Sequence, residues 1–536
     1  MSNNEIVIYV INNKNYKIII KNCLDFIQWQ SEELSMNPKI YLVITAFLFL
    51  NGCSTFRSYK TETQTLLSSV STGQIDQALT QHEAKNGSDK DLLYFMEKGE
   101  LQRLKKQYPD TIATWTEADH MIAQWESEAK ITGSRIGQAV GSAVVNDKGR
   151  RYDGEDYEKV MLSTRLALAY LAAGKTEDAL VEIKKTWERE DFIKSLHEKE
   201  IGEAERAASQ KGYSTRVEDL KGYPVSTLDS YEVINLKNGY QNAFSHYLSG
   251  FLYEATGELA LATASYRTAI ELQPNLNILK EGLLGIDKRL EVATVTNPVI
   301  VQQETPVKSE AVKTIAKKSK KKGKNGKLAK QIVETPIVAP VVVTPLITKP
   351  NESDVLFVVE TGVAPFKKSI MIPLPIPYAG IVPISFPIIE SNPISENKAV
   401  SLMFPNNSIE QLTTITSIEN LSRRALKDNM PSLMVRGAIR AAVKGASQAE
   451  AYRQNLLAGL VVNALNVATE QADERIWGLL PAEITVARVK LPEGQSTIKI
   501  QTSQGVKEVM VTISGKYVVI PIRLIGNSIY NLQAGL

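Results

Sequence analysis

Few residues of this chain combine a reactive side chain with a spacing that would support chemistry. The four histidines form no His-Glu-x-x-His motif. The sequence has no Gly-x-Ser-x-Gly elbow, no phosphate-binding Gly-Lys-Ser/Thr loop and no Ser-x-x-Lys nucleophile supported by its partner motifs. Acidic pairs such as Glu155-Asp156 and Asp473-Glu474 are typical of solvated surfaces. We therefore predict no catalytic residues, no metal site, no cofactor and no enzyme; His246 is expected to be structural.

The thiol of Cys53 has the most informative context. It follows an apolar run, Ile40–Leu50, that begins just after Lys39 and ends in Asn51 and Gly52. A positive start, an apolar stretch and small residues before a cleavage point form the pattern of a secretory signal. A membrane-spanning helix needs about 20 apolar residues, so a signal-anchor is a less favoured alternative, as is a core helix.

Cys53 directly after Leu50-Asn51-Gly52 resembles the lipobox of bacterial lipoproteins. The resemblance implies that residues 36–52 are a signal peptide, and that Cys53 is the lipidation site, carrying diacyl chains such as palmitate. It also implies a cell-envelope protein held at the outer membrane and facing the periplasm, because Ser54 rather than aspartate follows. Residues 1–35 have a different, asparagine-rich composition, and we predict a mis-assigned start or a disordered segment there.

Charge and cysteine content bound the remaining possibilities. The net charge of +3 hides a tract, Lys308–Lys330, with ten lysines and one glutamate, which leaves about −6 for the rest of the chain. Cys23 precedes the predicted signal, so the mature chain keeps Cys53 alone and can form neither a disulfide nor a zinc-thiolate site. The length of 536 residues allows two or three domains.

The pattern along the chain predicts a multidomain protein. An all-α, tetratricopeptide-like helical repeat domain is expected over 53–290, followed by a disordered Lys/Pro-rich linker over 291–350. An α+β domain ending in a β meander is expected over 351–536. The linker has proline at five Thr-Pro, Ala-Pro or Lys-Pro steps and cannot bury its lysines. Such a tether would let the two folded parts act at separate places, and its lysines could contact an anionic envelope polymer; nucleic acid is not expected.

The helical repeats are predicted from small and aromatic residues that recur at fixed spacings. The first helix of a unit carries a small residue, glycine ends that helix, and alanine and an aromatic residue follow on the second helix. The clearest unit contains Gly250, Tyr253, Gly257, Ala262, Tyr266, Ala269 and Pro274, a second contains Leu166, Ala167, Tyr170, Gly174, Ala179 and Ile183, and a looser third contains Gly99, Tyr108, Trp115 and Ala118. Gly73, Lys106, Gly174 and Gly257 take equivalent places, separated by 33, 68 and 83 residues. The last spacing indicates an insertion; a plain helical bundle is the alternative.

The C-terminal part reads as strands, then helices, then strands. Prolines in 369–386 argue for strand edges rather than continuous ladders. Ser417–Lys427 predicts a helix, Pro431 is expected to begin the next, and the apolar stretch around Leu456 predicts a central core helix. Four strands are expected between Glu483 and Leu524.

Three stretches carry a wider resemblance: Tyr152–Glu158 leading into Leu168–Gly174, Val358–Lys368, and Trp477–Pro481 with Ala487–Gly494. Together they resemble a group of conserved, largely uncharacterised Gram-negative lipoproteins with a tetratricopeptide-like N-terminal half and a mixed C-terminal domain. The resemblance implies outer-membrane anchoring and no established activity. Helical repeats expose a long face to partners, so we expect a non-catalytic scaffold that binds unknown envelope proteins. A cell-wall- or polymer-associated assembly factor is the alternative, and an enzyme of unrecognised type a second one.

Overall fold

The computed structural model describes residues 59–86, 90–132, 147, 151–212, 214–296, 352–376 and 380–533. The chain divides into two compact units, Met1–Ser68 and Ser69–Leu536. Cys53, the signal segment 36–52 and the tract Lys308–Lys330 lie outside the described residues, so what the sequence predicts for them stays a prediction. No helix in the described ranges is both long enough and apolar enough to cross a bilayer.

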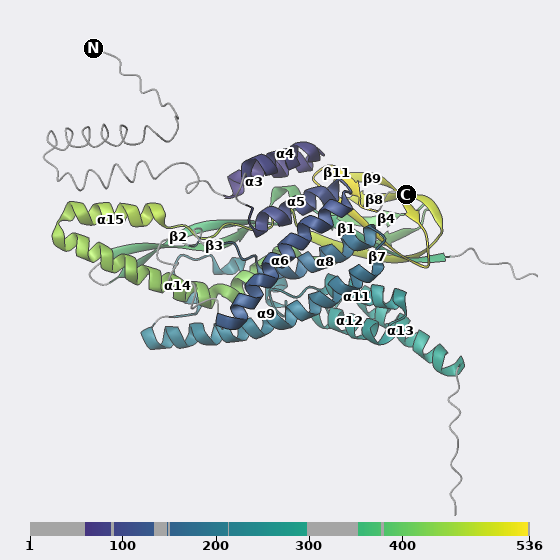
Figure 1. Cartoon of the computed structure of the whole chain (residues 1–536), viewed down its shortest axis with the longest axis horizontal. Coiled ribbons are helices and arrows are strands. Elements are labelled where there is room, and N and C mark those ends of the chain that lie inside the picture. Colours follow the sequence, from purple (N-terminus) through teal and green to yellow (C-terminus); the bar gives the residue numbers. More distant parts are fainter. Residues whose placement is uncertain are drawn as a thin grey trace, which may run out of the picture. The chain divides into compact units, whose positions relative to one another are not determined.

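Within the second unit, the N-terminal half is built from antiparallel helix pairs (Figure 1). Its main helices are α3 (Tyr59–Ser71), α4 (Ile75–Asn86), α5 (Leu92–Leu104), α6 (Tyr108–Thr132), α8 (Asp156–Ala172), α9 (Thr176–Lys211), α11 (Ala243–Thr256), α12 (Leu259–Leu272) and α13 (Asn277–Thr296). Between α9 and α11 lie η1 (Val217–Asp219), η2 (Val225–Thr227) and α10 (Tyr231–Ile234). These short helices and the extended end of α9 form the predicted insertion.

The backbone at the ends of the first helices confirms the repeat phasing. Gly73, Lys106, Gly174 and Gly257 all adopt left-handed conformations, with φ of 81°, 59°, 73° and 85°. Such a residue ends a helix and turns the chain into its antiparallel partner. The residue five positions later is fully buried in every case, as Ala78, Thr111, Ala179 and Ala262 show. The helical half is therefore tetratricopeptide-like, with Lys106 in a position where glycine is usual.

Close packing between the two helices of a pair explains why glycine occupies positions 99 and 250. A Cβ atom added to Gly99 would stand 2.2 Å from the Trp115 ring, and one added to Gly250 would stand 2.6 Å from the Tyr266 ring. Trp115 and Tyr266 both lie nine residues after the left-handed position and are fully buried. The aromatic ring thus fills the space that the missing side chain leaves between the two helices.

The C-terminal half contains two packed sheets and a separate two-stranded sheet. The five-stranded sheet has the order β11-β10-β1-β7-β6, the four-stranded sheet β5-β4-β8-β9, and β2 pairs with β3. The strands are β1 (Glu352–Thr361), β2 (Phe366–Ile376), β3 (Gly380–Glu390), β4 (Ala399–Met403), β5 (Ile409–Gln411), β6 (Thr413–Ser417), β7 (Glu483–Pro492), β8 (Gly494–Thr502), β9 (Gly505–Ile513), β10 (Tyr517–Ile525) and β11 (Ser528–Asn531). The four strands predicted at the C-terminus are confirmed, but they are shared between two sheets, and β10 pairs in parallel with β1.

Alternation along β1 gives the five-stranded sheet two different faces. Val355, Phe357 and Val359 point into the core between the two larger sheets. The intervening residues include Glu360, which points to the helical half and meets arginines of α5 and α8. One face of this sheet therefore makes the β-sandwich core, and the other packs on the first helices of the repeats.

The prolines of β2 and β3 are compatible with a full ladder. Pro373 pairs with Pro383. Pro375 and Pro387, the other prolines of the two strands, each lie an even number of residues from these, so all four occupy the same alternate set of positions. In an antiparallel pair, alternate positions make no ladder hydrogen bond, so prolines at those sites cost no N–H partner. Both strands are edges, as predicted, but the expectation that prolines break the ladder is wrong.

Two helix predictions in the C-terminal half are also wrong. α14 (Ile418–Gln454) begins close to the expected start, with Ser417 as its N-cap, but continues through Pro431 instead of restarting there. α15 (Leu456–Thr469) folds back along α14, beside β3, and is not a core helix. Of its residues only Gly459 and Asn466 are buried. Apolar composition alone suggested burial, and the exposed face of α15 contradicts it.

The helical and β-rich halves pack against each other within the second unit. Side chains of α5, α8 and α11 contact β1, β7 and β10. η1 and η2 contribute to a core with β2, β3 and α14. The prediction that the two folded parts act at separate places is therefore wrong, because the sheet covers the first helices of the repeats.

Candidate functional site at the junction of the two halves

Five buried charged side chains meet where the repeats contact the sheet. Glu100 and Arg103 come from α5, Arg165 from α8, Glu360 from β1 and Arg523 from β10, and none of their side chains is more than 2% exposed. Arg103 Nη2 lies 2.8 Å from Glu100 Oε1 and 2.5 Å from Glu360 Oε2. Arg165 bridges the same two carboxylates at 2.8 and 3.2 Å. The cluster thus links four elements, α5, α8, β1 and β10, that are far apart in sequence.

The electrostatics of this cluster indicate a structural role, in which the buried charges pair with one another and join the helices to the sheet. Burial alone would raise the pKa of Glu100, but the guanidinium groups of Arg103 and Arg165 outweigh it and hold that pKa at about 2. Burial lowers the pKa of Arg523 to about 10, against the attraction of Glu360 and Glu100. Arg523 donates to the Leu479 carbonyl at 3.1 Å. Permanently charged groups in mutual contact bind one another and do not supply an acid or base for catalysis.

Two further buried glutamates hold the loop that contains Trp477. Gly478 N–H and Leu479 N–H donate to Glu97 of α5 at 2.7 and 3.2 Å. Trp477 N–H donates to Glu158 of α8 at 2.7 Å, and the Tyr152 hydroxyl donates to the same carboxyl group at 2.5 Å. Ala364 N–H donates to the Gly478 carbonyl at 3.1 Å, so parts of the three resemblance stretches meet around one loop.

These two carboxyl groups have strongly perturbed acidities. Burial raises the pKa of Glu97 to about 8, even though two backbone N–H donors favour its charged form. Burial, reinforced by the neighbouring Glu155 carboxylate, raises the pKa of Glu158 to about 7. Perturbed carboxyls can mark catalytic sites. Both groups here accept hydrogen bonds from the backbone of the same loop, which supports a role in fixing that loop.

Replacing Glu97 by glutamine is expected to reduce the loss of stability as pH rises. The unfolded carboxyl ionises near 4.5, whereas the folded one keeps its proton up to about 8. The folded state therefore binds more protons between these values, and stability falls with rising pH across that window. Glutamine does not titrate, so the difference in unfolding free energy between pH 5 and pH 8 should shrink by on the order of a few kcal/mol. Urea unfolding at both pH values measures it; an unchanged difference would contradict the assignment.

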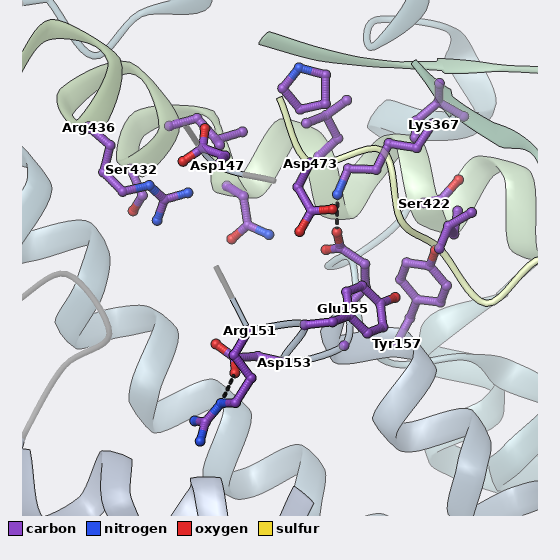
Figure 2. Close-up of a pocket in the computed structure, with 18 of the residues that line it drawn as sticks. Asp147, Arg151, Asp153, Glu155, Tyr157, Lys367, Ser422, Ser432, Arg436 and Asp473 are labelled. Carbon is purple, nitrogen blue, oxygen red and sulfur yellow. Dashed lines mark hydrogen bonds and ion pairs between the residues drawn. The ribbon is translucent and has the colours of Figure 1, made fainter. Parts of the chain in front are cut away.

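Beside this loop lies a pocket of about 150 Å³ between the two halves (Figure 2). Figure 2 shows Lys367 of β2 and Glu155, at the start of α8, reaching toward each other, and their charged atoms lie 2.5 Å apart. Burial alone would lower the pKa of Lys367, but the carboxylates of Glu155 and Asp473 outweigh it and raise that pKa. Arg151 and Asp153 form a second pair at 3.0 Å.

The charged groups of this pocket are engaged with partners inside the protein. Asp147 pairs with Arg440 at 3.0 Å and Asp473 with Arg475 at 2.8 Å, and Glu200 and Arg436 also have interactions. In the described ranges, no group of three or more His, Cys, Asp or Glu side chains is placed to hold a metal ion. The pocket has room for water or a small polar solute, and its ion pairs join β2 to the start of α8 and α14 to Asp147.

A larger groove lies at the other end of the junction. Its volume is about 530 Å³, and it lies between α8 and α11 on one side and β10 on the other. Leu168, Leu171 and Ala172 of α8 line it, as do Phe251, Leu252 and Ala255 of α11. Among the described residues that line it, Lys516 is the one with a charged side chain. This groove is a part of the first-helix face that the sheet does not fill.

The repeat residues predicted from sequence have packing roles. Buried among the helices are Leu166, Ala167, Ala179, Tyr253, Ala262, Tyr266 and Ala269. Gly174 and Gly257 have left-handed backbone, and Gly250 lies against Tyr266. Tyr170 is partly exposed, and Pro274 lies after the end of α12. None of these residues belongs to the charge cluster, and Cys53 lies outside the described residues.

His246 is fully buried, and its Nε2 lies 2.9 Å from the Glu190 carboxylate. Its ring packs edge-on against Trp187. This environment agrees with the structural role expected for it.

The junction residues themselves were not identified from sequence. Glu97, Glu100, Arg103 and Arg165 are charged residues on apparently ordinary helices, and their hydrogen-bond partners lie up to 382 positions away. One usable signal was present: a charged residue, Glu360, directly follows the apolar run Val355–Val359 in a strand. A charge at the end of a buried strand needs a partner, although sequence does not say which.

Comparison with known proteins gives no family for this chain. No family model matches it, and no curated protein matches it. Similar solved structures include the TPR2AB domain of yeast Sti1 in complex with pHSP90, with 14% identity, 44% of this chain and 85% of that chain covered, and a TM-score of 0.17. Two others are a tetratricopeptide repeat protein from Parabacteroides merdae (14% identity, 42% and 98% covered, TM-score 0.12) and the C-terminal part of a TPR repeat-containing protein from Cytophaga hutchinsonii (14%, 49% and 98%, 0.12). TM-scores this low do not establish a shared fold. The repeats are identified by the helix-pair geometry of this chain itself.

Proposed function

We propose that this protein is a non-catalytic scaffold of the bacterial cell envelope, anchored to the outer membrane through acylated Cys53 and facing the periplasm. Its partner is another envelope protein, which places an apolar peptide segment in the groove between α8, α11 and β10. The observation that carries the binding role is that the first-helix face of the repeats already binds polypeptide, the chain's own sheet, and is open at this groove.

The groove repeats the same positions of two repeat units. Leu168 and Phe251 each lie six residues before the left-handed glycine of their unit, and Ala172 and Ala255 each lie two residues before it. Helical repeat arrays bind extended segments through equivalent positions of successive first helices. A volume of about 530 Å³ is in the usual range of ligand sites, roughly 300–1,000 Å³. The lining combines apolar side chains of α8 and α11 with hydroxyl and amide groups, such as those of Ser514 and Gln533, and with Lys516. It suits a short segment that has apolar side chains and also carries a negative charge.

A photo-crosslinking amino acid in the groove should capture this partner. At Thr256, which lines the groove and is exposed, we expect a discrete adduct with one envelope protein in the native bacterium. At Ala264, which is exposed on α12 and does not line the groove, we expect none. Adding Ala255→Trp fills the groove and should abolish the Thr256 adduct, whereas Ala264→Trp should not. No adduct at Thr256, or the same adducts from both positions, would contradict the proposal.

The lipid anchor has its own test. The apolar run before Leu50-Asn51-Gly52-Cys53 supports it. Replacing Cys53 by alanine is expected to abolish incorporation of labelled fatty acid and to weaken membrane partition, because acyl chains contribute roughly 0.8 kcal/mol per buried methylene. Labelling and membrane fractionation measure both effects. Full fatty-acid labelling of the alanine variant would show that Cys53 is not the modified residue.

A further inference from the structure

α15 has its polar and apolar sides in the opposite arrangement to a helix of a water-soluble core. Leu456, Leu457, Leu460 and Val467 are 70, 50, 50 and 41% exposed, whereas Asn466 is 8% exposed. In water, an apolar stripe normally faces the core and polar residues face solvent. The solvent-facing side of α15 is therefore apolar, and the side against α14 contains the polar groups.

The polar groups of this helical hairpin form a buried network. Asn466 Nδ2 donates to the Lys444 carbonyl at 3.4 Å and to Gln448 Oε1 at 3.3 Å. Lys444 Nζ lies 2.5 Å from Glu470 Oε2, and Arg440 Nε lies 3.1 Å from the other oxygen of the same carboxylate. All five side chains are buried. Polar groups directed inward and paired with one another are what a protein shows when its outer surface meets hydrocarbon.

The two helices approach closely at a glycine. A Cβ atom on Gly459 of α15 would stand 1.9 Å from the Tyr452 ring of α14. Where α14 packs on β3, a Cβ atom on Gly437 would stand 3.1 Å from the Phe386 ring. Small residues at helix contacts are characteristic of packing in lipid, where no hydrophobic driving force holds helices together. This packing is a second feature that the hairpin shares with lipid-exposed proteins.

Charge is nearly absent from the exposed side. Between Gly445 and Thr469 the charged residues are Glu450 and Arg453, which pair at 3.4 Å. The adjacent β2 and β3 have no charged residue from Ser369 to Ile389, the residues 377–379 between them included. Met371 of β2 is 45% exposed and Ile381 of β3 is 61% exposed. Two neighbouring elements thus present uncharged apolar side chains.

We infer that the exposed face of α15, with Leu456, Leu457, Leu460 and Val467, inserts into the hydrocarbon edge of a lipid bilayer. A helix of 14 residues is about 21 Å long, less than the roughly 30 Å of a bilayer core. The contact is therefore shallow and lies in one leaflet. It is a membrane contact separate from the acyl chains on Cys53, and it does not depend on their presence.

The test uses the full chain carrying Cys53→Ala, so that no acyl chain contributes. The probe is a vesicle of phosphatidylcholine alone, in high salt, where contacts of the lysine tract with anionic lipid are screened. We expect this protein to float with the vesicles. Leu457→Ser with Leu460→Ser should reduce vesicle affinity by about 10- to 100-fold, from the apolar burial lost. Leu261→Ser with Leu284→Ser is the matched control, because those leucines are 46 and 55% exposed on α12 and α13, and should leave affinity unchanged.

A second readout locates the contact. With Cys23 and Cys53 both replaced by alanine, Leu460→Cys carries a polarity-sensitive dye whose emission should shift to the blue on adding vesicles; the same dye at Leu284→Cys should not respond. Failure of the Cys53→Ala chain to bind, binding only to anionic vesicles at low salt, or equal loss in both double variants would overturn the inference. So would a dimer in solution that the Leu457/Leu460 variant dissolves, because the face would then join two copies. None of these outcomes affects fatty-acid labelling at Cys53 or crosslinking at Thr256.

Discussion

Replacing Glu360 by alanine is expected to destabilise the second unit by about 3–5 kcal/mol, the usual cost of removing one partner from a buried charge cluster. The substitution leaves Arg103, Arg165 and Arg523 in a fully buried site with Glu100 as the remaining carboxylate. The guanidinium groups would then repel one another in a medium of low polarity. Urea unfolding should show a lower midpoint with cooperativity retained.

A surface pair provides the control for this prediction. Glu508 lies 3.5 Å from Lys499, and their side chains are 62 and 50% exposed. Exposed pairs contribute roughly 0–1 kcal/mol, so Glu508→Ala should barely move the midpoint. Equal midpoints for Glu360→Ala and Glu508→Ala would mean that the cluster does not hold the sheet on the repeats.

Gly239→Ala is expected to have a comparable effect by a steric route. Gly239 precedes α11, and an added Cβ atom would stand 2.3 Å from Cα and 2.4 Å from the backbone nitrogen of Ala425 in α14. Backbone atoms of a packed helix cannot move aside cheaply, and the Gly239 N–H also donates to Asp428 at 2.9 Å. We expect a loss on the order of 2–4 kcal/mol, typical of overpacking at a rigid contact.

Gly202 and Gly285 are the matched controls, because an added Cβ atom at either meets nothing within 4 Å. They lie inside α9 and α13, where alanine is favoured over glycine by about 0.5–1 kcal/mol. Both substitutions should therefore stabilise slightly. A Gly239→Ala protein as stable as these two would show that the helical half and α14 are not in backbone contact in solution.

The sequence was sufficient to predict the features that depend on a local pattern, such as helix ends and strand bounds. The left-handed positions Gly73, Lys106, Gly174 and Gly257 were found by spacing, because a helix-pair repeat imposes the same turn on each unit. Strand bounds near Glu483 and Tyr517 were found by alternation and turn residues. The pairing partner of each strand could not be predicted, because β1 pairs with β7 and β10, which lie more than 100 residues later in the chain.

The candidate site was largely beyond sequence reasoning, for two physical reasons. Charged residues such as Arg165 and Glu97 are ordinarily solvated, so only the tertiary structure shows that they are buried and paired. The α15 prediction failed for the opposite reason: an apolar helix was assigned to the core, although an apolar face can also meet another apolar phase. Asn463 and Asn466 on one side of that helix were the signal that it is not apolar all round.

The C-terminal half is bound to the helical repeats by its own contacts and is not merely joined to them through 291–350. Proteolytic cleavage within Lys308–Lys330, followed by size-exclusion chromatography under native conditions, tests it most directly. The two fragments should elute together as one species of the uncut size, and Glu360→Ala with Gly239→Ala should allow them to separate. Fragments of the unsubstituted protein that elute apart after cleavage would contradict the account.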